Sequence, residues 1–370
     1  MSSRRASLWI VALLLLVGIG ALVRNPVRTW YHSNYGRPAP SKGHLWGPEG
    51  LAVDREGGIY AADQRNGNIT LFDPAGKFIT QFSQVDGYKN GDGETAPVSR
   101  GLYMAAIAPR HLVFVAAHNV AEVEIQADLK PRLVRTIGSR GHEPGQMDGP
   151  EGISRDTNGD LYVTDEHNRR INVFNPEGKF LRFFSVPQDP QCVTVWKDRV
   201  YVSLNKRNYL ACYTKDGVER FRIGTEAIFP YIVWTMGISA AAALAILSAL
   251  RKGRWAVLIP VIILAIGALG CVADFVYHHQ PGQFRLPEHI LVSPDERSLY
   301  ISDRWNCRIQ VFDLDGKYQR CFGERGTALG QFREPKQMAW TPDGRLLVSD
   351  RENNRIQIFT PSGAPLGTIE

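Results

Sequence analysis

Three glutamates and a lysine each follow a proline at recurring places in the chain, and together they could bind a cation or a polar ligand. They are Glu49, Glu151, Glu288 and Lys336. Two related positions in weaker copies of the same pattern carry Tyr103 and Gln191. Carboxylates that meet can hold a divalent cation or shift one another's pKa, provided that the fold brings them together. The alternative interpretation is that these side chains only contact solvent.

A second set of polar and aromatic residues lies in the turn halfway through each repeat that is described below. Its members are Arg65, His167, Lys206, Trp305 and Glu352. Long side chains of mixed chemistry at loop tips are typical of binding rims. Ordinary solvated loop tips would show the same composition, so both interpretations stay open.

The sequence lacks the motifs of enzymes that use a nucleophile or a metal-bound water. No G-x-S-x-G, H-E-x-x-H, H-x-x-x-H or C-x-x-C spacing occurs. The catalytic residues therefore stay unknown, and enzymatic activity is undecided, with a non-enzymatic role favoured. No cofactor is predicted. A divalent metal, Ca²⁺ or Zn²⁺, on Glu49, Glu151 and Glu288 is the alternative.

The polar part of the chain repeats, and the repeat defines the elements that must position these residues. Four copies are clear, starting at Pro48, Pro150, Pro287 and Pro335, and two weaker copies cover residues 103–137 and 191–223. Each contains four short runs of alternating apolar and polar residues, separated by turn residues. This is the pattern of β-strands in an antiparallel sheet.

Six units of four strands predict a six-bladed β-propeller, in which each blade packs against its neighbours. The first strand of each blade then lines a central channel, and the residue after the proline faces the channel mouth. The links between blades and the turn in the middle of each blade lie on this same face. We therefore expect the two sets of residues above to form a channel mouth and a surrounding binding rim.

The repeat resembles the NHL repeat family. The resemblance rests on the opening Pro-x-Gly-Ile or Pro-x-Gly-Leu, the Tyr-Val-x-Asp or Leu-Val-x-Asp run and the Asn-x-Arg-Ile-x-Val-Phe run, over about residues 44–224 and 280–370. The second and fourth copies depart from it, because His118 and Leu204 replace the aspartate. The resemblance implies the fold and little about function, since such propellers host binding modules and enzymes alike.

Two kinds of enzyme have propellers of a similar pattern. The peptidyl-hydroxyglycine amidating lyase uses zinc held by His residues directly after the motif proline, and these positions hold Glu or Lys here, so the ligands do not carry over. Gluconolactonase-like propellers use a carboxylate- and Asn-bound divalent metal, which Glu49, Glu151 and Glu288 could imitate. A lactonase-like hydrolase is therefore the alternative function, ahead of the lyase.

Other charged residues recur once per copy, which predicts a structural role rather than a functional one. A carboxylate at the end of a strand can accept backbone N–H groups of the following turn. The residues concerned are Asp63, Asp165, Asp303 and Asp350, together with Arg170, Arg308 and Arg355.

Three apolar segments interrupt the polar chain. Residues 8–23 are uncharged, and residues 228–250 and 255–277 are runs of 23 residues on either side of a basic loop at 251–254. A helix of that length spans a hydrocarbon core of about 30 Å. The sequence therefore predicts a signal anchor at 1–24, a linker at 25–43, blades 1–4 at 44–227, a transmembrane helical hairpin at 228–277, and blades 5–6 at 278–370.

Basic residues in short loops set the orientation of membrane helices. We expect the N-terminus and the 251–254 loop in the cytoplasm, and the propeller outside it on the inner or plasma membrane. The expected partners are the membrane and a membrane or envelope protein. The net charge of +6 is modest and scattered, so no nucleic-acid partner is expected.

Taken together, these patterns predict an all-β, six-bladed β-propeller with an N-terminal transmembrane helix and an inserted transmembrane helical hairpin. The expected function is a membrane-anchored, NHL-type binding or scaffolding module, periplasmic or extracellular, whose ligand face is tethered toward the membrane. A peptide, a glycan or another envelope protein is the expected ligand.

Overall fold

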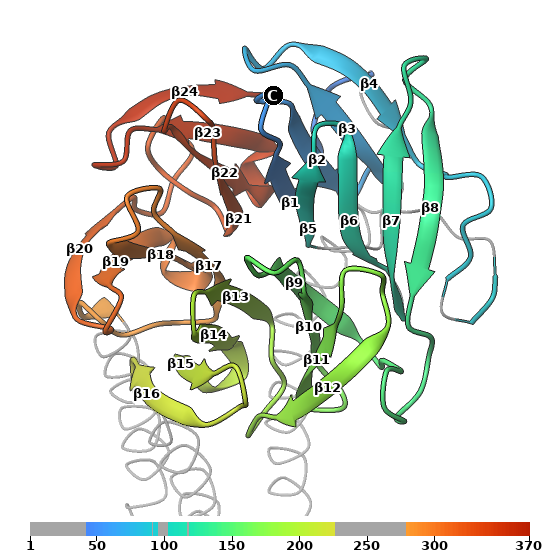
Figure 1. Cartoon of the computed structure of the whole chain (residues 1–370). Coiled ribbons are helices and arrows are strands. Elements are labelled where there is room, and N and C mark those ends of the chain that lie inside the picture. Colours follow the sequence, from blue (N-terminus) through green and yellow to red (C-terminus); the bar gives the residue numbers. More distant parts are fainter. Residues whose placement is uncertain (1–41, 91, 95–102, 117, 226–278) are drawn as a thin grey trace, which may run out of the picture. The chain divides into compact units, whose positions relative to one another are not determined.

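The computed structural model describes residues 42–90, 92–94, 103–116, 118–225 and 279–370. Residues 1–44 and 45–370 form two separate units, and the second unit holds the strands described below. These strands build six antiparallel sheets of four strands each, and every sheet consists of four strands that are consecutive in the sequence. Each sheet is one blade of the propeller (Figure 1).

The blades follow the chain in order from the first to the sixth. Blades 1 to 3 consist of β1 (Pro48–Val53), β2 (Ile59–Asp63), β3 (Asn68–Phe72) and β4 (Phe78–Phe82); β5 (Met104–Ala108), β6 (His111–Ala116), β7 (Asn119–Ile125) and β8 (Pro131–Ile137); and β9 (Pro150–Arg155), β10 (Leu161–Asp165), β11 (Arg170–Phe174) and β12 (Phe180–Ser185). Blades 4 to 6 consist of β13 (Cys192–Trp196), β14 (Arg199–Leu204), β15 (Tyr209–Thr214) and β16 (Glu219–Ile223); β17 (Pro287–Val292), β18 (Ser298–Asp303), β19 (Arg308–Asp313) and β20 (Tyr318–Phe322); and β21 (Pro335–Trp340), β22 (Leu346–Asp350), β23 (Arg355–Phe359) and β24 (Pro365–Ile369).

The first strand of each blade contacts the first strands of both neighbouring blades. Strand β1 contacts β5 and β21, β9 contacts β5 and β13, and β17 contacts β13 and β21. The six strands therefore form a closed ring, which confirms the six-bladed propeller predicted from the repeats. The ring closes between blades 6 and 1 without exchange of a strand, and Gln337 bridges the closure by accepting the N–H of Leu51 (2.8 Å) and donating to the carbonyl of Met104 (2.9 Å).

The hydrophobic core lies between neighbouring blades. The second strands β2, β10 and β22 are buried at every position, because both faces of each sheet pack against another blade. The outer strands alternate instead: in β12, Leu181 and Phe183 are exposed, whereas Phe184 is buried. A blade alone would expose both faces of its inner strands, so the blades stabilise one another.

The recurring aspartates have a structural role as predicted, but in blades 3, 5 and 6 the backbone N–H that they accept comes from the link that enters the blade rather than from the following turn. Asp165 has no exposed surface and accepts the N–H of Asp148 (2.7 Å), Nδ2 of Asn168 (2.8 Å) and Nε of Arg170 (2.9 Å). Arg170 in turn donates to the carbonyl of Gln146 at 2.9 Å. Each aspartate thereby fixes the link that enters its blade, and blades 5 and 6 repeat these contacts through Asp303 and Asp350.

Three blades depart from this aspartate clamp, and in blade 4 Leu204 occupies the aspartate position, opposite Tyr209. In blade 1, Asn68 stands where the arginine would be, and burial raises the pKa of Asp63 to about 6. In blade 2 the register places Ala116 opposite Asn119, where Asp165 faces Arg170 in blade 3. Ala116, rather than the predicted His118, therefore replaces the aspartate of blade 2.

No helix in the described ranges is long and apolar enough to span a bilayer. The segments expected to do so, residues 1–24 and 228–277, lie outside those ranges. The short helices η2 (Asn205–Arg207), η3 (Arg304–Asn306) and η4 (Arg351–Asn353) are single 3₁₀ turns, which rise about 2 Å per residue, far short of a core about 30 Å thick.

This finding corrects three expectations. The fold class is an all-β six-bladed propeller, without support for the N-terminal transmembrane helix or the inserted transmembrane hairpin. The three transmembrane helices expected as contacts with the membrane are contradicted in the same way, and the membrane or envelope protein partner inferred from them loses its basis. The expected membrane localisation, which depended on the same segments, is contradicted as well.

Candidate functional site

The residue after the motif proline occupies the same place in four inner strands. The proline pairs with the blade aspartate, as Pro48 does with Asp63 and Pro335 with Asp350, and the register shifts directly afterwards. Such a β-bulge accommodates residues without a direct partner and re-aims their side chains. Because the inner strands form a ring, this bulge places four side chains at one end of the ring: Glu49, Glu151, Glu288 and Lys336.

Three of these four residues meet in one buried cluster. Lys336 Nζ donates to Glu288 Oε1 and lies 4.0 Å from Glu49 Oε2. The side chains are at most 7% exposed. The ammonium group therefore lies between carboxylates that come from blades 1 and 5.

Two arginines and a glutamate that the sequence did not single out extend this cluster. The guanidinium of Arg351 pairs with Glu49, and Arg304 Nη1 lies 3.7 Å from Glu288 Oε2. Glu334 Oε2 accepts from Arg304 Nη2 (2.7 Å) and lies 3.3 Å from Arg351 Nη1. We call the whole cluster the mouth network, and it consists of Glu49, Glu288, Arg304, Glu334, Lys336 and Arg351.

Three negative and three positive charges balance within the mouth network. Burial by itself would raise the pKa of Glu288 and of Glu334. The charges of Lys336 and Arg304 outweigh burial at Glu288, and Arg304 followed by Arg351 does so at Glu334, so both pKa values are held below their usual range. Glu288 and Glu334 therefore remain ionised and neutralised at physiological pH.

The mouth network does not fit the divalent metal considered as an alternative. Glu49 and Glu288 are both engaged by cationic side chains. An ammonium group lies where a metal ion would have to bind, and like charges repel at this distance. Over the described part of the chain, no three His, Cys, Asp or Glu side chains are grouped so that they could hold a metal ion.

The half of the mouth formed by blades 3 and 4 carries a different arrangement. Glu151 Oε2 accepts from Gln191 Nε2 at 3.1 Å, and Gln191 Oε1 accepts from Asn205 Nδ2 at 2.5 Å. No ion pair within the described ranges includes Glu151. Burial, followed by the charge of Glu166, raises the pKa of Glu151 to about 8. Glu151 as a whole residue is only partly buried at its place in β9.

Tyr103, the blade 2 candidate, is buried and contacts protein only. Its ring stacks on His289, with centroids 5.9 Å apart, and its hydroxyl donates to the carbonyl of Glu288 at 3.2 Å. His289 Nδ1 accepts the N–H of Met338 at 3.3 Å, and burial lowers the pKa of His289 to about 3. This imidazole is therefore neutral at physiological pH. The stacked rings of Tyr103 and His289 are both buried inside the ring of strands.

Three of the five expected rim residues are held by ion pairs. Arg65 Nη2 lies 2.5 Å from Glu352 Oε1, and both side chains are largely buried. Arg351 Nη1 lies 2.7 Å from the same carboxylate oxygen, which joins this pair to the mouth network. Lys206 Nζ contacts Asp189 Oδ2 at 2.6 Å. These three side chains stiffen the rim.

The other two rim residues are accessible, as is the side chain of Lys206, which is 55% exposed. Trp305, in η3, is 44% exposed and lies under the guanidinium of Arg285, whose carbon is 5.2 Å from the ring centroid. The His167 side chain is 59% exposed, with Nδ1 3.5 Å from Asp148 Oδ2. An aromatic ring and an imidazole at the edge of a polar mouth are suited to contact a ligand.

Replacing Glu151 by Gln is expected to flatten the dependence of stability on pH. The wild-type carboxyl titrates near 8 in the fold, against 4.5 ordinarily, so the folded chain binds a proton more tightly and loses stability as the pH rises through that interval. Because Glu151 is only partly buried as a residue, we expect less than the full effect of this shift, a gain on the order of 2 kcal/mol for the variant at about pH 8.5.

Thermal unfolding of both proteins at about pH 5 and about pH 8.5 measures this effect. The variant should gain on the wild type at the higher pH and much less at the lower pH. A difference that is the same at both values would show that Glu151 has an ordinary pKa.

Comparison with known families supports the repeat assignment in two places. The family described as NHL repeat matches residues 147–174, and the family described as Lactonase, 7-bladed beta-propeller, matches residues 273–364. Together these matches cover parts of blades 3, 5 and 6.

Curated relatives match short stretches. Peptidyl-glycine alpha-amidating monooxygenase A of Xenopus laevis is 37% identical over 90 residues, which is 22% of this chain and 10% of that protein. NHL repeat-containing protein 3 of Homo sapiens is 32% identical over 95 residues, 24% of each chain. The chain therefore spans from a tenth to a quarter of the length of these relatives.

Solved structures share the fold over most of the chain. An auxiliary nutrient binding protein from Bacteroides thetaiotaomicron has a TM-score of 0.56 at 12% identity and covers 90% of this chain and 72% of its own. A virginiamycin B lyase from Staphylococcus aureus has a TM-score of 0.50 at 15% identity, with 89% and 86% covered. At such identities the likeness concerns the fold alone. The six sheets and the NHL match together show that the chain is a six-bladed β-propeller with an NHL repeat at residues 147–174.

Proposed function

We propose that this propeller is a binding module whose ligand site is the mouth of the central ring, with Glu151 as the principal contact. The observation that supports the proposal is the asymmetry of the mouth. On the side of blades 5, 6 and 1 every carboxylate of the mouth network is paired with a cation. On the side of blades 3 and 4, the Glu151 carboxylate has an amide, that of Gln191, as its side-chain partner among the described residues.

The chemistry of that half of the mouth defines the ligand. A carboxylate that is costly to ionise, next to an amide, gains most from a positively charged group that also donates hydrogen bonds. The amino terminus or a lysine of a peptide has both properties. Trp305 and His167, on the rim, offer contacts for the remainder of the peptide. The ligand class that fits is therefore a cationic peptide.

This proposal is tested by screening the purified protein against a displayed library of random peptides and, in parallel, against a glycan array. We expect enriched peptides to carry Lys, Arg or a free amino terminus, and to lose about tenfold or more in affinity for Glu151→Gln, about the loss of one charge-assisted hydrogen bond. Asp128→Asn, in an exposed turn between β7 and β8, is the matched control and should bind like the wild type. Failure to enrich any peptide, or peptides indifferent to Glu151, would contradict the proposal, and selective glycan binding would replace the peptide as ligand.

The lactonase match over residues 273–364 favours one alternative, a hydrolase that uses a metal near Glu49, Glu151 and Glu288. The arrangement of the mouth network argues against it, because Lys336 lies between two of these carboxylates. Metal content of the purified protein, with thermal unfolding in Ca²⁺, Zn²⁺ and EDTA, separates the two functions. Stoichiometric metal with loss of stability in EDTA would favour the hydrolase, and neither effect is expected for the binding module.

A further inference from the structure

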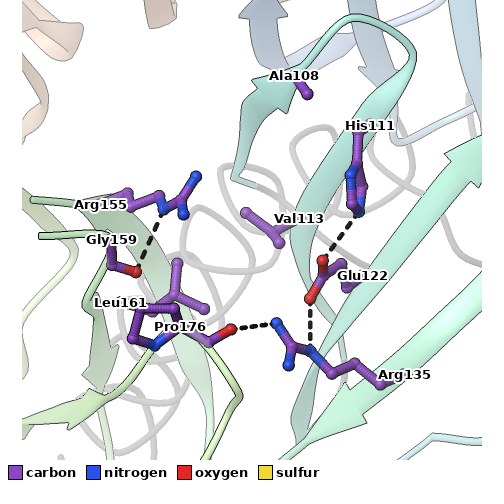
Figure 2. Close-up of a pocket in the computed structure, with 9 residues that line it drawn as sticks. All are labelled: Ala108, His111, Val113, Glu122, Arg135, Arg155, Gly159, Leu161 and Pro176. Carbon is purple, nitrogen blue, oxygen red and sulfur yellow. Dashed lines mark hydrogen bonds and ion pairs between the residues drawn. The ribbon is translucent and has the colours of Figure 1, made fainter. Parts of the chain in front are cut away.

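A pocket of about 220 Å³ lies between blades 2 and 3 (Figure 2). Arg155, which lines it, is the last residue of β9, whereas Glu151 lies near the first residue of that strand. Strands of blade 2 form one wall, through Val113, Glu122 and Arg135. The turns on either side of β10 and β11 form the other, through Gly159 and Pro176. This pocket, here called the blade 2–3 pocket, shares no residue with the mouth network or the rim.

Four blades carry a tyrosine at one position, three residues before the end of the second strand. The tyrosine fills the space toward the next blade, and its hydroxyl contacts a turn of that blade in three cases. Tyr300 Oη donates to the carbonyl of Pro361 (2.6 Å), Tyr201 Oη donates to that of Leu314 (2.8 Å), and Tyr60 Oη accepts the N–H of Arg110 (3.0 Å). All four are at most 3% exposed, and they are Tyr60, Tyr162, Tyr201 and Tyr300.

Blade 2 has a valine at this position. Val113 lies opposite Glu122, as Tyr162 lies opposite Val173 and Tyr300 opposite Val311. A valine has neither the ring nor the hydroxyl, so it cannot reach the turn of blade 3. The blade 2–3 pocket is therefore the space that a phenol ring occupies in the equivalent position of other blades.

The partner of the missing hydroxyl is present in blade 2. Arg320 of blade 5 donates to Tyr300 Oη (2.9 Å) and to the carbonyl of Pro361 (2.7 Å). Arg135 has the same place in the ladder, opposite Glu122, and donates to the corresponding carbonyl, that of Pro176 (Figure 2). The pocket thus keeps the donor and acceptor that hold a phenol hydroxyl in blade 5.

Glu122 adds a buried acceptor to this wall. It is 5% exposed, its Oε1 lies 2.8 Å from His111 Nε2, and its Oε2 accepts from Arg135 Nε at 2.5 Å. In blades 3 and 5 a valine occupies the same register position. A carboxylate oxygen carries more than one lone pair, so it can accept an O–H from a ligand while it stays paired.

We propose that the blade 2–3 pocket binds a phenol ring, supplied either by a free small phenol or by a tyrosine side chain of another molecule. The ring would pack on Val113 and Leu161, as the tyrosines of the other blades pack in their own positions. Its hydroxyl would bond within the group formed by Glu122, Arg135 and the Pro176 carbonyl. This site is independent of the peptide site proposed at the mouth.

Titration of the full chain with p-cresol, which is the tyrosine side chain as a free molecule, tests this site. Isothermal calorimetry should give saturable binding with a Kd of about 1 mM or tighter, a modest efficiency for a ligand of this size. Toluene, which lacks the hydroxyl, should bind at least about tenfold more weakly because the polar wall stays unpaired. The capped tripeptide acetyl-Gly-Tyr-Gly-amide is the second probe, and the tighter of the two ligands identifies the source of the phenol.

Two variants make the test specific. Val113→Tyr should fill the pocket and abolish binding of p-cresol, whereas Glu151→Gln, at the distant mouth, should leave it unchanged. Absence of saturable binding for both phenol probes would overturn the proposal. Equal affinity for toluene, or binding retained in Val113→Tyr, would overturn it as well, and none of these results bears on the peptide site.

Discussion

Replacing Asp350 by Ala is expected to destabilise the propeller by about 3–5 kcal/mol, the usual effect of breaking a buried ion pair by removing one partner. Asp350 has no exposed surface and accepts from Arg355 Nε (3.0 Å), Gln357 Nε2 (2.9 Å) and the N–H of Arg333 (2.7 Å). Its removal leaves a buried guanidinium without a counter-charge and frees the link that enters blade 6.

Because blade 6 closes the ring against blade 1, the effect should reach the whole molecule. Thermal unfolding should move down by on the order of 10 °C as one cooperative step. Asp350→Asn keeps an acceptor without the charge and should lie between wild type and Ala. Asp128→Ala, in an exposed turn, is the control and should change little. A loss below about 1 kcal/mol for Asp350→Ala would contradict the clamp.

Lys336→Met is expected to lower the free energy of unfolding by a similar amount, about 3–5 kcal/mol, because it removes a buried cation rather than a buried anion. It removes the ammonium group between Glu288 and Glu49 and leaves two buried carboxylates facing one another. The pKa of Glu288, now held below its usual range, should rise once Lys336 is gone. In the wild type the depressed pKa contributes stability above the ordinary value of 4.5, which is lost as the pH falls below it.

A double variant separates this electrostatic cause from lost packing. Glu288→Gln combined with Lys336→Met removes a charge of each sign and should recover much of the stability in urea denaturation. The matched control is Lys197→Met, because Lys197 pairs with Glu296 at 2.8 Å with both side chains more than half exposed. That change should cost less than about 1 kcal/mol. No recovery in the double variant would show that the mouth network does not depend on charge balance.

The blades could be predicted from sequence because each repeat carries its own local signals. Four openings at Pro48, Pro150, Pro287 and Pro335 are also the first residues of β1, β9, β17 and β21. The two weaker copies were placed by alternation alone, and both form four-stranded blades. The exception is the aspartate position of blade 2. The sequence alignment placed His118 at this position, whereas the strand pairing places Ala116 there.

The contacts at the mouth could be predicted only in part. The position directly after the motif proline located Glu49, Glu288 and Lys336. It could not show that these side chains would form ion pairs, because the pairs join side chains from three blades. Arg304 and Arg351 carried a signal that was not used: each directly follows a blade aspartate. Tyr103 was placed at the mouth, whereas its ring is buried against His289.

The blade 2–3 pocket could also have been predicted by aligning the repeats. Aligned copies show tyrosine at four equivalent positions and Val113 in blade 2. One missing ring is invisible to the hydrophobic pattern, since both residues are apolar and both fit a strand. A position where one copy departs from the others therefore indicates a candidate site that the hydrophobic pattern alone does not reveal.

The side-chain carboxyl of Glu151 offers the most direct test of the account. Carbon-detected NMR of the full chain, with Glu151→Gln to assign the signal, follows its titration alone and with a peptide selected for binding. We expect a pKa of about 8 without ligand and a clearly lower pKa with a cationic peptide bound, because the positive group stabilises the ionised form. An ordinary pKa without ligand, or a titration that the peptide leaves unchanged, would contradict a binding site centred on Glu151.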